Sequence, residues 1–128
     1  MLKAIKRLLE RSRYVICISL TVLVIYLSLG QTADLMVAID VSDKSLHGFA
    51  YFGLSLSWMF AIHKSHSSFK WKVYIGFALF LLGVLLEFLQ GNITDYRATD
   101  YLDAIANTIG IIIAVISFRN LLRLYHSF

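Results

Sequence analysis

Ionisable and amide side chains recur at helical spacing beside three long apolar stretches of the chain. Residues three or four positions apart lie on one face of an α-helix. This spacing relates Asp43, His47 and Tyr51 (with Lys44 close to the same face), then Glu87 and Gln90, and finally Asp100, Asp103 and Asn107. Glu, His and Asp side chains can transfer protons in general acid–base catalysis. Lys44, and Arg97 between the second and third sets, could hold a phosphate or carboxylate group.

The elements that must position these side chains are four apolar runs, at residues 14–29, 46–62, 71–90 and 101–118. Hydrophobic residues make up 59% of the 128 residues and charged residues 16%, whereas a soluble domain has roughly 25% charged residues. A soluble domain of this length has too small an interior for so much apolar surface. Each run is long enough, or nearly so, to cross a hydrocarbon core of about 30 Å as a helix. We therefore expect an all-α integral membrane bundle of four transmembrane helices.

Small residues continue the polar sets along the third and fourth runs. Gly76, Phe80 and Gly83 extend the Glu87 face, and Gly110 and Ala114 extend the Asn107 face. Small side chains let membrane helices approach closely, so these faces are predicted to point into the bundle. Three polar faces then meet at one mouth of the bundle, next to a loop that carries Arg97.

The distribution of basic residues predicts the orientation. Ten of the twelve lysines and arginines lie in the N-terminal segment, between the second and third runs, or after the fourth run; they are Lys3, Lys6, Arg7, Arg11, Arg13, Lys64, Lys70, Lys72, Arg119 and Arg123. Glu10 is the one acidic residue on that side. Basic loops stay on the cytoplasmic side of a membrane. Both termini are therefore predicted to be cytoplasmic, with the polar mouth on the outer face.

The chain divides into a basic amphipathic N-terminal segment (1–13), a transmembrane domain (14–118) and a basic C-terminal tail (119–128). In the first segment Leu2, Ile5, Leu8 and Leu9 share one helical face, opposite the basic residues. This pattern is typical of a helix that lies on an anionic membrane surface, or of an ordinary helix extension with a solvated basic face. The first apolar run has a further interpretation, as a cleaved signal peptide.

Composition excludes several classes of function. The one cysteine, Cys17, rules out an internal disulfide and a cysteine-cluster metal site. Neither a nucleophile elbow nor a glycine-rich phosphate loop is present. Since membrane topology accounts for the basic residues, no nucleic-acid partner is expected, and no cofactor is expected either.

Residues 43–54, DKSLHGFAYFGL, resemble the second-helix signature of VanZ-like proteins, which is Asp-Lys-x-x-His followed by an aromatic and small residues. Residues 87–90, EFLQ, look like the Glu-x-x-Gln of that family. The series Arg97, Asp103, Asn107, Thr108 and Gly110 is similar to its Arg…Asp-x-x-x-Asn-Thr-x-Gly. The elements follow the family's order and spacing over residues 43–110. Where the family commonly has proline just before the arginine, this chain has Asp95-Tyr96.

The resemblance implies a multi-pass protein of the bacterial inner (plasma) membrane with a role in resistance to glycopeptides, chiefly teicoplanin, or in maintenance of the cell envelope. The expected ligand is an anionic envelope component, and the expected partners are membrane lipids and a lipid-linked cell-wall precursor or a glycopeptide. The candidate ligand-binding residues are Asp43, Lys44, His47, Tyr51, Glu87, Gln90, Arg97, Asp103 and Asn107. His47, Glu87 and Asp103 are the catalytic candidates if a reaction occurs.

Other interpretations of the polar residues stay open. They could form a membrane-embedded enzyme that modifies a lipid-linked precursor, or they could hold the helices together through Glu87–Arg97 and Asp103–Lys44 pairs, with Gln90 and Asn107 bridging helices. A small dimeric drug exporter is disfavoured because proton coupling calls for an ionisable residue near the bilayer midplane. A metal site is disfavoured because His47, Glu87 and Asp103 lack a recognised ligand spacing.

Overall fold

The computed structural model describes residues 1–29, 43–63, 68–93 and 101–127. Its helices are α1 (Leu2–Arg11), α2 (Arg13–Leu29), α4 (Asp43–Ile62), α5 (Phe69–Ile93) and α6 (Tyr101–His126). Across these described ranges the chain forms helices and no strands. The predicted all-α class is therefore confirmed.

Two of the helices, α5 and α6, are long and apolar enough to cross a membrane. A third span results if α1 and α2, which are bent by 66° at their junction, are counted as one broken span. In α4 the first turns carry Asp43, Lys44 and His47, which lower the hydropathy of that helix. Membrane association thus follows from the helices, while the number of spans and their orientation stay predictions.

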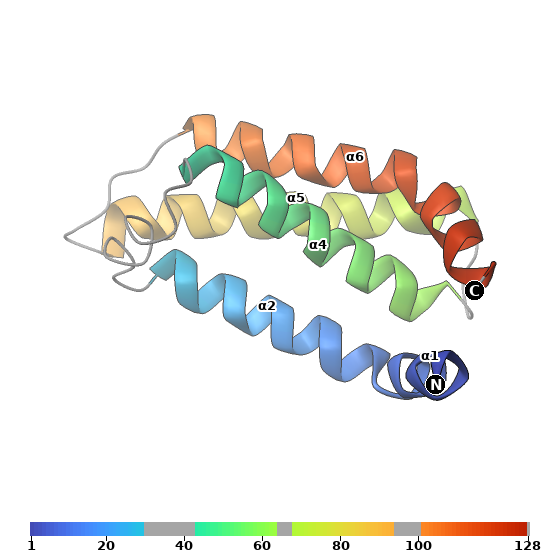
Figure 1. The fold of residues 1–128 in the computed structure, drawn as a ribbon. Coiled ribbons are helices and arrows are strands. Elements are labelled where there is room, and N and C mark those ends of the chain that lie inside the picture. The colour runs from blue at the N-terminus through green and yellow to red at the C-terminus, as the bar shows by residue number, and fades with distance from the viewer. Residues whose placement is uncertain (30–42, 64–67, 94–100, 128) are drawn as a thin grey trace.

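Helices α2, α4, α5 and α6 lie alongside one another as an elongated bundle (Figure 1). Both termini lie at the same end of this bundle, and α4 and α6 both begin at the opposite end, where α2 and α5 finish (Figure 1). Consequently α4 and α6 run in the same direction, and the predicted polar mouth lies at the end away from the termini.

The closest helix pair is α4 with α6. An ideal Cβ placed on Gly110 would lie 2.2 Å from the backbone oxygen of Gly48 and 3.1 Å from the backbone nitrogen of Phe52. Backbones come this close only where both helices have small residues. Further along the same contact Ala114 is fully buried, and it packs with Met59 and Phe118. The prediction that Gly110 and Ala114 face the bundle interior is confirmed.

A second buried cluster links α4 to α5 and α6 through Tyr51, Leu54, Leu79 and Ile111. Outside these clusters α5 and α6 expose many apolar side chains, such as those of Phe77 and Ile116. Exposed apolar surface over much of the length of a helix is expected where lipid replaces water.

Three local features differ from the sequence-based expectations or refine them. Phe80 is exposed, whereas Gly76 and Gly83 on the same face of α5 are buried; the phenyl ring is too large for the close approach that the glycines allow. Helix α6 continues through most of the basic segment 119–128 and ends at His126. The bend at Ser12 makes α1 a separate helix and not an extension of α2.

Candidate functional site

The first turns of α4 and α6 bring together four of the predicted site residues. The Nζ atom of Lys44 lies 3.7 Å from Oδ1 of Asp103, and Nε2 of His47 lies 3.7 Å from Oδ2 of the same carboxylate. Nδ1 of His47 lies 3.1 Å from the amide oxygen of Asn107. Both helices begin at this end and run in parallel, so residues early in each helix come to the same depth.

Asp103 is the centre of this group. It is 5% exposed, and its two oxygens face different basic side chains, Lys44 and His47. Nδ1 of His47 can donate its hydrogen to the amide oxygen of Asn107, while Nε2 of the same ring faces the carboxyl group of Asp103. Asn107 thus orients the imidazole against the Asp103 carboxyl group, which is an arrangement suited to moving a proton.

Helix α5 supplies two more buried polar side chains at the same end of the bundle. Glu87 is 4% exposed and Gln90 is 3% exposed. Nε2 of Gln90 donates a hydrogen bond to the backbone oxygen of Ser28 over 2.7 Å, which ties α5 to the end of α2. Such a buried amide bridges two helices, as the helix-packing interpretation predicted.

The glycine at position 83 lets the α4, α5 and α6 parts of the group meet. An ideal Cβ on Gly83 would lie 3.2 Å from Nδ2 of Asn107 and 3.4 Å from Cε1 of Tyr51. Glu87 is one helical turn after Gly83. The side chains of Tyr51 and Asn107 therefore pack against α5 at Gly83, one helical turn before the buried carboxyl group of Glu87.

The structure places seven of the nine candidate ligand-binding side chains at one end of the bundle: Lys44, His47, Tyr51, Glu87, Gln90, Asp103 and Asn107. Arg97 and the side chain of Asp43 lie outside the described residues. The Lys44–Asp103 pair and the bridging role of Gln90 both agree with the helix-packing interpretation. Among the described side chains, no group of three His, Cys, Asp or Glu is arranged to hold a metal ion.

One contact of the group was not anticipated from the sequence, namely the backbone oxygen of Ser28. The last four carbonyl groups of a helix have no partner within that helix. Helix α2 ends at Leu29, so the Ser28 carbonyl is one of these groups. In the sequence, the end of the first apolar run indicated carbonyl groups without a partner in their own helix. Gln90 was a side chain that could donate a hydrogen bond to one of them.

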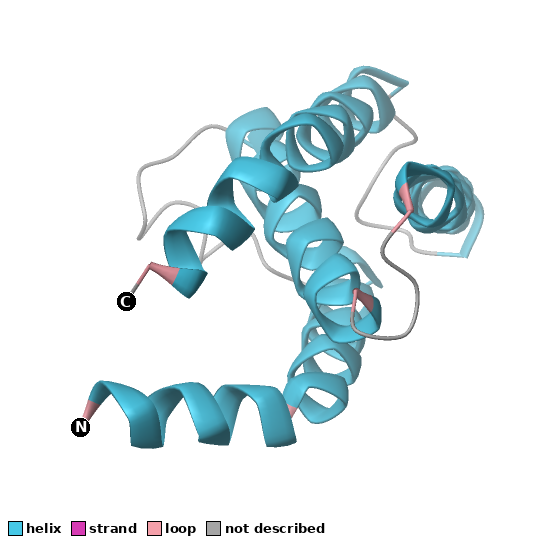
Figure 2. Cartoon of the chain, turned by 90° about the vertical axis from the view of Figure 1, so that its right-hand side faces the viewer, coloured by secondary structure: helices cyan, strands magenta, loops and turns pink. Residues whose placement is uncertain are grey.

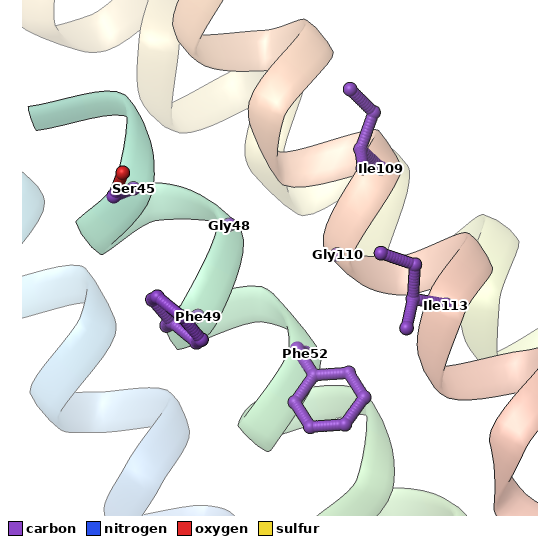
Figure 3. A pocket seen from close by; sticks show the side chains of 7 residues that line it. All are labelled: Ser45, Gly48, Phe49, Phe52, Ile109, Gly110 and Ile113. Atoms are coloured by element: carbon purple, nitrogen blue, oxygen red, sulfur yellow. The ribbon is translucent and has the colours of Figure 1, made fainter.

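An apolar groove of about 280 Å³ lies between α4 and α6, where the two helices are in contact (Figure 3). Its lining residues are Ser45, Gly48, Phe49, Phe52, Ile109, Gly110 and Ile113. Gly48 and Gly110 have no side chains to fill this space. The groove reaches Ser45, the residue that follows Lys44 in the sequence, and so lies along the same part of α4 as the polar group.

These features define an all-helical protein of the membrane-associated class with a buried charged group at one end of its bundle. No family model, no curated protein and no solved structure matches this chain. The resemblance to VanZ-like proteins therefore stays a prediction that rests on the motifs at residues 43–54, 87–90 and 97–110.

Proposed function

We propose that this chain is a VanZ-like multi-pass protein that binds an anionic cell-envelope ligand at the outer face of the bacterial inner membrane. In this proposal four helices span the membrane, both termini are cytoplasmic, and the polar group opens to the outside. The physiological role is resistance to glycopeptides of the teicoplanin type, or maintenance of the envelope that these drugs attack.

The observation that carries the proposal is the burial of two carboxyl groups, Glu87 and Asp103, at one end of a small bundle. Removing a charged group from water costs several kcal/mol, and a buried ion pair recovers little of it as stability. Amides such as Gln90 and Asn107 bridge helices in a membrane at a lower cost. Helix packing alone therefore does not call for carboxyl groups here, whereas a carboxyl group that positions a cation such as Lys44 for an anionic ligand accounts for Asp103.

The exposure of Lys44 supports a binding role for the group. Its side chain is 49% exposed although Nζ faces the buried Asp103. A lysine that reaches both water and a buried carboxylate can exchange part of its contact with Asp103 for contact with an incoming anion. His47 lies 3.7 Å from the other oxygen of the same carboxyl group and remains its neighbour when Lys44 moves.

The basic residues of the described helices support the proposed orientation. Most of them lie in α1, at the start of α5 or at the end of α6, which are all at the end of the bundle that holds the termini (Figure 1). The buried carboxylates lie at the opposite end. The positive-inside rule then directs the termini to the cytoplasm.

The test of this proposal is the Arg97→Ala variant, expressed in a host whose susceptibility to teicoplanin is measured. We expect loss of resistance with an unchanged amount of protein in the membrane, because an arginine near water gains only about 0–1 kcal/mol from a salt bridge. Arg119→Ala is the matched control, since Arg119 is exposed on α6 near the other end of the bundle. Full resistance in the Arg97 variant would contradict the proposal.

The apolar groove beside Lys44 favours one second candidate, an enzyme that modifies a lipid-linked cell-wall precursor. Such a substrate combines phosphate groups with a hydrocarbon chain, and the groove could take part of that chain. His47, oriented by Asn107 and next to Asp103, would be the general base. Mass spectrometry of lipid and precursor extracts, from cells with and without the gene, separates the candidates. A precursor of changed mass supports the enzyme, and unchanged precursors with retained resistance support binding alone.

A further inference from the structure

Helix α1 carries three distinct strips of residues along its length. Leu2, Ile5, Leu8 and Leu9 form an apolar strip, and Lys3, Arg7 and Arg11 form a basic strip on the other side. Lys6 and Glu10, four residues apart, lie between the two. We call the first two strips together the α1 surface.

The contacts of α1 with the rest of the protein use the strip between these two. Lys6 and Glu10 are the two residues of α1 that are partly shielded, and every other residue of this helix is exposed. Nζ of Lys6 lies 5.0 Å from the ring centroid of Tyr125, near the end of α6. The α1 surface therefore stays uncovered within the described protein, although Leu2 and Leu8 are among its most exposed apolar side chains.

The bend at Ser12 sets the direction of α1. The chain bends by 66° between α1 and α2, so α1 lies across the end of the bundle (Figure 2). If α2 runs along the membrane normal, α1 lies much closer to the membrane plane. In that position the apolar strip can enter the edge of the hydrocarbon region while the basic strip stays among the head groups.

Charge identifies the kind of surface that α1 fits. Arg119 and Arg123 lie at the end of α6, and Lys70 and Lys72 lie at the start of α5, so the basic strip is part of a larger basic end. Anionic leaflets attract basic segments of this kind that lie next to a membrane-spanning helix. An acidic protein would pair with the basic strip but would leave the apolar strip in water.

We propose that α1 is an interfacial anchor that binds the anionic phospholipid leaflet on the side of the termini, with Leu2, Ile5, Leu8 and Leu9 inserted. The contact between Lys6 and Tyr125 holds the anchor against α6. This proposal does not depend on the ligand of the polar group, which lies at the opposite end of the bundle.

The experiment measures the depth of α1 in the full-length protein, reconstituted into vesicles of phosphatidylcholine alone or of equal parts phosphatidylcholine and phosphatidylglycerol. In a Cys17→Ala background, Leu8→Cys and Arg7→Cys each carry a fluorophore that aqueous dithionite reduces. We expect the label at position 8 to be reduced several-fold more slowly than the label at position 7. The difference is expected to be larger in the anionic vesicles.

A charge variant tests the role of the lipid. Neutralising the basic strip with Lys3→Gln, Arg7→Gln and Arg11→Gln is expected to speed reduction at position 8 in anionic vesicles and to change it little in phosphatidylcholine. A label at Ile116→Cys, on exposed α6, reports whether each variant has inserted. Equal reduction rates at positions 7 and 8 would overturn the anchor. Slow reduction at position 8 that is the same in both vesicle types would overturn the preference for anionic lipid.

Discussion

Asp103 shows why single residues in this bundle have to be judged by their surroundings. Its carboxylate is buried, and it faces a half-exposed lysine on one side and a histidine held by an amide on the other. Burying a carboxyl group costs less when basic or polar side chains face both of its oxygens, as they do here. Asp103 thus contacts a side chain that reaches water, whereas the hydrogen bond from Gln90 to Ser28 lies inside the bundle.

The first residue-scale prediction concerns Glu87. Glu87→Gln keeps the shape of the side chain and removes its charge, so the bundle is expected to keep its stability because a neutral amide costs less to bury. Resistance is expected to be lost at normal abundance if the carboxylate pairs with a cation or moves a proton. Teicoplanin susceptibility and immunoblots of membrane fractions measure the two effects.

Gln90→Met is the control for that variant, because the hydrogen bond of Gln90 to the Ser28 carbonyl makes it, among the candidate residues, the one that the helix-packing interpretation explains. It removes one interhelical hydrogen bond, which is worth about 1 kcal/mol, and leaves both buried carboxylates in place. We expect slightly lower thermal stability in detergent with resistance retained. If Glu87→Gln retains resistance, or loses it only in proportion to the loss of protein, the polar residues only hold helices together, and the proposed ligand site is wrong.

At the scale of elements, the parallel pair of α4 and α6 determines where the polar group forms. Gly48 and Gly110 let the two backbones touch, and this contact sets the depth at which His47 meets Asn107. The same two glycines also line the apolar groove. One crossing point thus shapes both the charged and the apolar surface at this end of the bundle.

Gly110→Ala tests this crossing. Its new Cβ would lie 2.2 Å from the backbone oxygen of Gly48, so the helices have to separate, at an expected cost of about 3 kcal/mol. Gly53→Ala is the matched control on α4, since a Cβ there meets no atom within 4 Å. It is expected to leave stability unchanged or to raise it by up to about 1 kcal/mol. Unfolding in detergent, followed by circular dichroism, measures both; equal stability of the two variants would show that the close approach is not needed.

The sequence predicted the helices and the grouping of polar faces because both depend on local periodicity. Spacing of three or four residues was enough to assign Asp103, Asn107 and Gly110 to the interior face of one helix. The exposure of Phe80 was not predicted, because a helical face does not reveal how much room the facing helix leaves. The pairing of Gln90 with the Ser28 carbonyl required the packing of two helices that are distant in the sequence.

At the scale of the whole molecule, the two ends of the bundle differ in chemistry. The end with the termini carries α1 and the basic residues of α5 and α6, together with the aromatic side chains of Trp71 and Tyr74, which pack edge to face. Aromatic side chains of this kind favour the membrane–water interface. The other end buries Glu87 and Asp103. A bundle whose ends differ in this way favours one orientation in a membrane. Both proposals, ligand binding by the polar group and membrane anchoring by α1, depend on that orientation.

The last prediction tests the orientation with reporter fusions. A reporter that works only in the cytoplasm is expected to be active when fused after Phe128, and a reporter that works only outside is expected to be active when inserted near Asp95. The physical reason is the concentration of Lys and Arg in α1, in early α5 and in late α6, since moving these charges across the membrane is unfavourable. The purified protein is also expected to keep residues 1–30. An N-terminus at Gln31 would instead show that the first run is a cleaved signal peptide. Reversal of the two reporters would place the polar group inside the cell, where it could not meet an envelope ligand, and the proposed function would have to be abandoned.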